Sequence, residues 1–154
     1  MSSSTPAINE HGHRIEKPAT PGEYKRLPNH VLQPDGSIHH YVEPIHVPAE
    51  MAALCQWIAE REGTLHPAIV AAVTHYNMVR IHPFDDGNGR GARILMNLIL
   101  LRAGFVPTVI RNEDRAAYLT TLRQADAGSF EPFAYFTLSA LIATEERILH
   151  DLAA

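Results

Sequence analysis

The stretch from His82 to Arg93 reads HPFDDGNGRGAR and lies between two segments that have the apolar spacing of helices. It combines one imidazole, two carboxylates, three glycines, one amide and two guanidinium groups. Glycine lets the backbone turn tightly and approach a ligand closely. A helix that begins near Asn88 also points unpaired N–H groups and a positive dipole end at the same place. The stretch therefore predicts an anion-binding loop between two helices.

The charged side chains of this loop indicate that the anion is a phosphate. Arg90 and Arg93 are three residues apart, so they share one face of the first helical turns. Cations are disfavoured there unless an anion offsets the dipole. Either Asp85 or Asp86 is expected to hold Mg²⁺, which takes its other ligands from water and phosphate oxygens. The proline after His82 biases this residue away from helical geometry, and its imidazole can then serve as a general base.

Each of these features has a structural explanation when taken singly. A histidine after a helix is often structural, Asp-Gly and Asn-Gly pairs make turns, and an arginine on a first turn can pair with a carboxylate. Together they would require a coincidence of base, metal ligand, close-approach glycines, helix N-terminus and paired arginines. The combination therefore favours a catalytic site.

The flanking sequence predicts a mostly helical domain. Glycines and prolines delimit the helices: Gly63 and Gly104 stand where C-terminal caps belong, and Pro67 and Pro132 stand in first turns. Asn112 is expected to cap the fourth helix. The predicted helices span 48–63, 64–80, 88–103, 112–125 and 132–152. The side chains expected to face inward are Met51, Leu54, Cys55, Ile58, Ile69, Val70, Val73, Tyr76, Ile94, Leu95, Leu98, Ile99, Phe133, Phe136, Ala140 and Ile148.

The N-terminal third is different in character. Residues 1–21 show no period and are interpreted as an arm or flexible tail. Residues 31–46 predict a β-hairpin, because a turn pair at Asp35-Gly36 separates two short β-prone runs. Prolines at positions 28, 34, 44 and 48 cannot donate ladder hydrogen bonds. This hairpin should therefore lie at an edge, with its backbone open to a partner.

Composition narrows the class of protein. The chain has 154 residues, of which 45% are hydrophobic, enough for one domain with a core. Its net charge of −4 gives no basic stripe for nucleic acid. It has no apolar run long enough for a membrane span and no signal-peptide pattern, so we expect a cytoplasmic location. The lone Cys55 and the scattered histidines, His11, His13, His39, His40, His75 and His82 among them, lack zinc-ligand spacing.

The loop resembles the signature of the Fic (filamentation-induced-by-cAMP) family, His-x-Phe-x-Asp/Glu-Gly-Asn-Gly-Arg-x-x-Arg, and matches each of its specified positions. The resemblance implies a mostly α fold, a Fic-type helical bundle with a β-hairpin flap near the active-site loop. It covers about 22–148, which makes 22–154 the expected catalytic domain. The family-like parts are the Pro-Gly-Glu-Tyr entry, the hairpin, the helix with Leu54 and Trp57, and the segments at Tyr118 and Pro132-Phe133.

Members of that family transfer AMP from ATP to a hydroxyl side chain of a target protein. The resemblance therefore implies a protein adenylyltransferase that uses ATP as co-substrate with Mg²⁺, and whose partner is a target protein. It makes His82 the base that deprotonates a Ser, Thr or Tyr hydroxyl for attack on the α-phosphate. It makes Asp86 the magnesium ligand, and Gly87, Asn88 and Gly89 the anion hole.

Further roles follow from the same resemblance. Arg93 would grip the γ-phosphate, whereas Arg90 would assist phosphate binding or hold the loop by a salt bridge. Asn112 and Tyr118 stand where the family lines its adenine pocket, although Asn112 could equally be a helix cap and Tyr118 a core residue. The hairpin around 37–45 matches the flap that holds the target segment by main-chain pairing.

Other reactions stay open at this point. In a phosphotransferase variant of the fold, lysine replaces the second glycine of Gly-Asn-Gly, so Gly89 favours AMP transfer. Other donors, removal of AMP, or a nucleotide-binding module without turnover are alternatives, although binding alone requires no base such as His82. Many relatives carry an inhibitory Ser/Thr-x-x-x-Glu helix, which is absent from this sequence. Either the chain is active without such restraint, or a separate antitoxin-like protein supplies the glutamate, or the inhibitory helix was removed. An unrestrained modifying enzyme would harm its host, which favours the last two alternatives.

Overall fold

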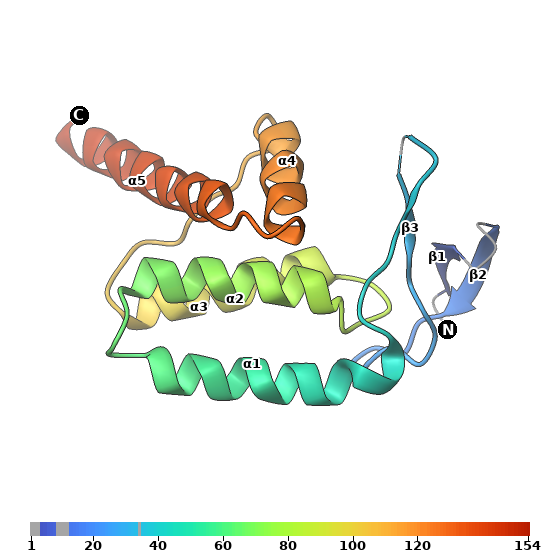
Figure 1. Ribbon diagram of the computed structural model, residues 1–154. Coiled ribbons are helices and arrows are strands. Elements are labelled where there is room, and N and C mark those ends of the chain that lie inside the picture. Colours follow the sequence, from blue (N-terminus) through green and yellow to red (C-terminus); the bar gives the residue numbers. More distant parts are fainter. Residues whose placement is uncertain (1–3, 9–12, 34) are drawn as a thin grey trace. The chain divides into compact units, whose positions relative to one another are not determined.

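A computed structural model describes residues 4–8, 13–33 and 35–154 (Figure 1). The chain forms two compact units, one from residues 1–57 and 77–91 and one from residues 58–76 and 92–154. Its strands are β1 (Ser4–Ile8), β2 (Arg14–Pro18), β3 (Val31–Leu32) and β4 (Ile38–His39). A 3₁₀ helix at Pro44–His46 precedes α1 (Val47–Arg61), α2 (Pro67–Ile81), α3 (Asn88–Arg102), α4 (Arg115–Asp126) and α5 (Glu131–Ala153). The mostly α fold with small hairpins agrees with the sequence-based prediction.

The first unit contains a hairpin that the sequence did not predict. β1 and β2 pair antiparallel with Ser4 opposite Pro18 and Ile8 opposite Arg14, within the segment interpreted as an arm or tail. Ala7 and Ile8 are buried, so the described part of this arm contributes to the core. Patterning missed it because the two strands contain prolines and charged residues and alternate only weakly. The proposed domain boundary at residue 22 stays a prediction.

The predicted second hairpin is present, with its first strand as expected and its second strand shorter than the predicted run from Ile38 to Val42. β3 and β4 pair antiparallel through Val31–His39 and Leu32–Ile38. Gly36 has φ +84°, and the Asp35 carboxylate accepts the Ser37 N–H at 2.9 Å, which accounts for the turn at Asp35-Gly36. The last part of the predicted flap instead forms the 3₁₀ helix. The prediction for Pro34 lies outside the described residues.

The helix boundaries follow the predicted caps, with one exception. α2 begins at Pro67 and α3 at Asn88, while Gly63 and Gly104 adopt φ +82° and +85° just beyond helix ends. Asn112, however, does not cap α4. The helix begins at Arg115 with Asp114 at its N-cap, and Asn112 only accepts the Arg115 N–H through its main-chain carbonyl.

Several side chains expected to face inward are exposed. Ile94 and Leu98 on α3 are 70% and 49% exposed, whereas Met96 and Leu100 are buried. The prediction took Ile94, Leu95, Leu98 and Ile99 as the inward side chains, but a helix with apolar residues on several faces does not reveal which stripe faces the core. Cys55 and Ile148 are also exposed. None of the described helices is long and apolar enough to cross a membrane.

The core of the second unit surrounds Phe133, whose side chain is fully buried. Its ring lies 5.6 Å from that of His75, 6.1 Å from that of Tyr76 and 6.2 Å from that of Tyr118. These residues belong to α2, α4 and α5, so one aromatic cluster joins three helices of this unit. Aromatic pairs at such separations contribute beyond the area they bury.

Candidate active site

Two unusual backbone conformations shape the loop between α2 and α3. α2 ends at Ile81, and His82 then adopts φ +52°, a left-handed conformation that is strained for a residue with a side chain. Such conformations cost about 1–3 kcal/mol and cluster at functional sites. Gly87 has φ +82°, and a Cβ there would lie 3.3 Å from the Arg90 side chain. The left-handed φ favours glycine at this turn, whereas Gly89 lies inside the first turn of α3.

Asn88 closes the loop on itself. Its Oδ1 accepts the Phe84 N–H at 2.8 Å, and its Nδ2 donates to the Phe84 carbonyl at 2.8 Å. The residue is 2% exposed. This side chain is thus committed to holding the loop. Any contribution of Asn88 to the predicted anion hole comes from its backbone N–H at the start of α3.

The two adjacent carboxylates have different environments. Asp85 is 8% exposed, lies 2.7 Å from the ammonium of the buried Lys17 and accepts the Thr20 N–H at 3.1 Å. Asp86 is 68% exposed, accepts the Gly87 N–H at 2.6 Å and lies 3.2 Å from Arg90. Asp86, unlike Asp85, is therefore open to a solvated ion.

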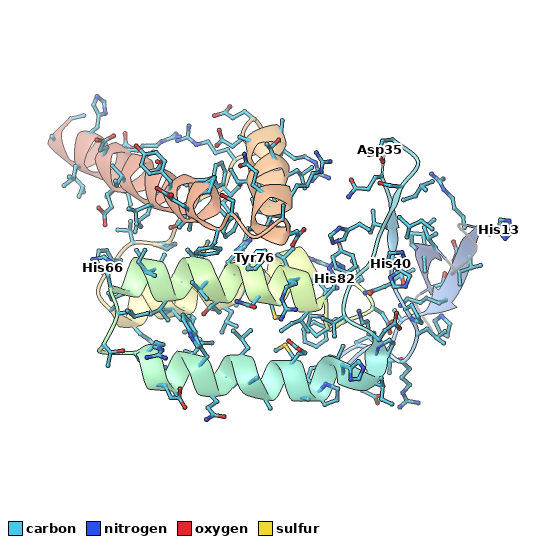
Figure 2. All side chains as sticks on the ribbon, viewed as in Figure 1. His13, Asp35, His40, His66, Tyr76 and His82 are labelled. Carbon is cyan, nitrogen blue, oxygen red and sulfur yellow. The ribbon has the colours of Figure 1, made fainter. Side chains whose placement is uncertain are left out.

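His82 is held as a neutral base. Its Nδ1 lies 3.2 Å from the Val79 carbonyl. A carbonyl only accepts, so Nδ1 carries the proton and Nε2 is left with its lone pair. The Tyr41 ring stacks on the imidazole with the centroids 3.7 Å apart. Burial lowers the pKa of His82 to about 4, against the opposing contact with Val79, and the nearby Lys25 charge lowers it further. In Figure 2, His82 and His40 lie toward the base of the hairpin whose tip is marked by Asp35.

A cavity of about 460 Å³ opens beside the loop within the first unit. Asp86 and Arg90 line it, together with Asp85 and Phe84, and the unpredicted hairpin and the segment after it form the rest of its wall. That part of the wall consists of Ser4, Thr5, Ala19, Thr20, Pro21 and Gly22. The N-terminal segment therefore shapes the space in front of the exposed carboxylate.

The remaining predicted site residues belong to the second unit. The Tyr118 hydroxyl lies 3.0 Å from Nε2 of the buried His75. Burial and then the positive charge of Arg93 lower the pKa of His75 to about 4, so Arg93 and Tyr118 both lie near this imidazole. Asn112 is exposed and precedes α4. Its main-chain carbonyl accepts the Arg115 N–H, a contact that does not involve His75, Tyr118 or Arg93.

Sequence reasoning missed three residues that contact the loop but lie far from it in the sequence. Lys17, Lys25 and Asn29 are all buried, and Lys25 and Asn29 contact the carbonyls around His82. They stand in stretches without helical or strand periodicity, so single-sequence patterning carries no signal for their burial. A lysine is normally expected at the surface.

Magnesium chemistry is compatible with this donor set. Among the described residues, no group of three His, Cys, Asp or Glu side chains is placed to enclose a metal ion. A cation at Asp86 would therefore have one protein carboxylate and take its other ligands from water and phosphate. Mg²⁺ is commonly bound in this way, because it dehydrates reluctantly.

Comparisons with known proteins show the family to which the chain belongs. The Fic/DOC family model matches residues 6–100, and this chain belongs to that family. It is 50% identical over 88 residues to a protein adenylyltransferase Fic of Nematostella vectensis, and 45% identical over 94 residues to one of Drosophila melanogaster. These matches cover 56% and 58% of this chain but only 21% and 19% of the relatives. The chain thus spans about a fifth of the length of these curated relatives.

A solved structure extends the likeness beyond the loop between α2 and α3. A Fic domain containing signaling protein from Bacteroides thetaiotaomicron superimposes with a TM-score of 0.78 at 38% identity. The match covers 81% of this chain and 53% of that one. The helical fold is therefore shared over most of the chain.

Proposed function

We propose that this chain transfers AMP from ATP to a hydroxyl side chain of a target protein. The observation that carries the proposal is the neutral imidazole of His82 beside the N-terminus of α3. Support also comes from relatives named protein adenylyltransferase Fic that are 45–50% identical. The intact base favours turnover over nucleotide binding alone.

The proposed reaction follows from the placement of these groups. Nε2 of His82 takes the proton from the target hydroxyl, and the hydroxyl oxygen forms a bond to the α-phosphorus as the bond to pyrophosphate breaks. Backbone N–H groups of Gly87, Asn88 and Gly89 and the dipole of α3 stabilise the charge on the phosphate oxygens. The Gly87 turn leaves room for the phosphate chain to approach the backbone.

Asp86 is the proposed magnesium ligand. When bound, the ion neutralises phosphate charge. Arg90 pairs with Asp86 at 3.2 Å in an exposed pair, and exposed pairs of this kind are weak. Arg90 is therefore proposed to leave the carboxylate for phosphate when nucleotide enters. Arg93 is proposed to bind the γ-phosphate, and Asn112 and Tyr118 the adenine.

The target segment is proposed to pair with the edge of the β3–β4 hairpin. Val31 and Leu32 are 45% and 43% exposed, and a two-stranded ribbon leaves outer main-chain groups open to a third strand. A cytoplasmic location, and inhibition by a glutamate from a separate antitoxin-like protein, belong to the same proposal.

The position of a radiolabel tests the reaction. The protein is incubated with Mg²⁺ and cell lysate, with ATP labelled on the α-phosphate in one sample and on the γ-phosphate in another. Covalent label on protein from the α-labelled sample alone is the expected result. His82→Ala should abolish the label but keep ATP binding, measured by calorimetry.

Two outcomes would contradict the proposal. Label from the γ-labelled sample alone would mean phosphotransfer. Full α-label transfer by His82→Ala would remove His82 from the role of base. If neither sample yields labelled protein although the protein binds ATP, the result favours a nucleotide-binding module without turnover over an enzyme that uses ATP.

A further inference from the structure

Lys25 and Asn29 converge on the main chain of the catalytic loop. The Lys25 N–H donates to the Pro83 carbonyl at 2.7 Å, and Asn29 Nδ2 donates to the Phe84 carbonyl at 2.8 Å. Two longer contacts of 3.5 Å join Lys25 Nζ to the Ile81 carbonyl and Asn29 Nδ2 to the His82 carbonyl. The segment 25–29 therefore contacts the carbonyls of four consecutive residues, 81–84.

These carbonyls need such partners. They follow the end of α2, where main-chain oxygens lack helical donors, and they flank the strained His82. A left-handed conformation persists at a non-glycine residue only when its surroundings hold it in place. Lys25 and Asn29 are 3% and 7% exposed, so water does not compete freely for these contacts.

The Lys25 ammonium also sets the orientation of Asn29. Its Nζ donates to Asn29 Oδ1 at 2.7 Å. This contact makes Oδ1 the acceptor and directs Nδ2 toward Phe84. Loss of the ammonium would leave the amide free to flip and present its oxygen to the loop carbonyls. The two residues therefore act as a pair.

Lys25 is also close to the side-chain support of His82. Its ammonium lies 5.9 Å from the centroid of the Tyr41 ring, which stacks on the imidazole. The titratable groups that act on His82 are Lys25, His39 and Lys17, and those that act on Lys25 are Lys17, Glu43 and Asp85. A positive charge near an imidazole disfavours its protonated form.

We infer that Lys25 and Asn29 form a carbonyl clamp that positions His82, holding its main chain in the left-handed conformation with the Lys25 ammonium close to its imidazole. The expected effect on the rate of AMP transfer rests on the proposed function. The expected effect on the pKa of His82 does not. Neither residue touches the reacting atoms, so both are positioning residues.

The test has one arm that does not depend on activity. The pKa of His82 is measured by NMR titration of the unliganded protein, with the signal assigned by its loss in His82→Ala. Lys25→Met should raise the pKa of His82 by about one unit, whereas Lys25→Arg, which keeps the charge and donors, should restore it. Arg26→Met is the matched control, because Arg26 is the next residue and its side chain is 78% exposed. It should leave the pKa of His82 unchanged.

The second arm is kinetic. Asn29→Asp keeps a partner for Lys25 but loses the Nδ2 donor, so it should lower kcat for AMP transfer on the order of tenfold with KM for ATP unchanged. Lys25→Gln replaces Lys25→Met if the latter does not fold. A pKa of His82 that is the same in wild type and in a folded Lys25→Met or Lys25→Gln variant would overturn the clamp. Absence of transfer by the wild type would instead overturn the proposed function, and the titration would still test the clamp.

Discussion

At His82, a strained main chain and a directed side-chain contact occur in the same residue. The imidazole donates through Nδ1 to Val79 and has a pKa lowered to about 4 by burial. The proposed general-base role needs the neutral form of the imidazole, and the low pKa keeps His82 neutral well below pH 7. The structure thus adds an electrostatic property that residue type alone does not specify, since an ordinary histidine titrates near 6.5.

This property predicts the acid limb of the activity profile. The neutral imidazole is present above the folded pKa and is lost as pH falls through about 4. Transfer under saturating ATP should therefore stay constant from pH 8 to about pH 5.5 and fall only below that. The measurement is the initial rate of AMP labelling against pH. A half-maximal rate near pH 6.5 would show that His82 titrates like a solvated histidine.

Asp85 and Asp86 show how far the loop could be interpreted from the sequence. The motif named both as metal-ligand candidates, and the resemblance chose Asp86. In the structure Lys17, 68 residues before Asp85 in the chain, neutralises the Asp85 carboxylate in a buried pair. Sequence reasoning found the residues of the loop because they are contiguous, and missed Lys17 because its partner is remote.

At the scale of elements, the β1–β2 hairpin is joined to the catalytic loop. Lys17 on β2 lies 2.7 Å from Asp85, with exposures of 2% and 8%. Removing one partner of a buried pair leaves an uncompensated charge, which typically costs about 3–5 kcal/mol. The hairpin therefore contributes to the stability of the loop.

A double-mutant cycle tests this connection. Lys17→Met should lower the free energy of unfolding by about 3 kcal/mol, and Lys17→Met combined with Asp85→Asn should recover part of the loss, because no charge is then left unpaired. Urea unfolding of the four proteins gives the coupling energy. Additive effects of the two substitutions would mean that the hairpin is not held by this pair.

The aromatic cluster joins α2, α4 and α5 of the second unit. Phe133→Ala should lower the free energy of unfolding by about 3–5 kcal/mol, because the fully buried ring contacts His75, Tyr76 and Tyr118. Tyr135→Ala on the same helix is the control, since Tyr135 is 73% exposed. Its effect should stay within about 0.5 kcal/mol. If chemical denaturation showed the same loss of unfolding free energy for Phe133→Ala and Tyr135→Ala, Phe133 would lie outside the core.

For the whole molecule, buried neutral histidines make stability depend on pH. The pKa values of His75 and His82 are each lowered to about 4 by burial, and that of His30 is also lowered. The unfolded chain binds protons near pH 6.5, so below that value it holds more protons than the folded chain, and stability falls as pH falls. Above pH 6.5 both states are neutral at these positions and the contribution is complete.

The expected result is a loss of unfolding free energy between pH 6.5 and pH 4. Each of His75 and His82 contributes up to about 1.4 kcal/mol per pH unit. Urea unfolding at several pH values measures the slope of the unfolding free energy against pH. His75→Gln should reduce this slope, whatever the substitution does to stability at pH 7. A wild-type slope of zero over this range would show that these imidazoles are not buried.

What the sequence by itself determined is the contiguous and periodic part of the protein: the loop between α2 and α3, five helices with most of their ends, and the turn of the second hairpin. These features depend on neighbours within a few residues, where glycine, proline and apolar spacing act directly. The predictions failed where burial is decided by distant partners, as for Ile94, Leu98, Cys55, Ile148 and the cap at Asn112. Tertiary structure alone decided that Lys17 neutralises Asp85 and that Lys25 and Asn29 reach the carbonyls around His82, because burying an ammonium or an amide depends on partners that folding brings together.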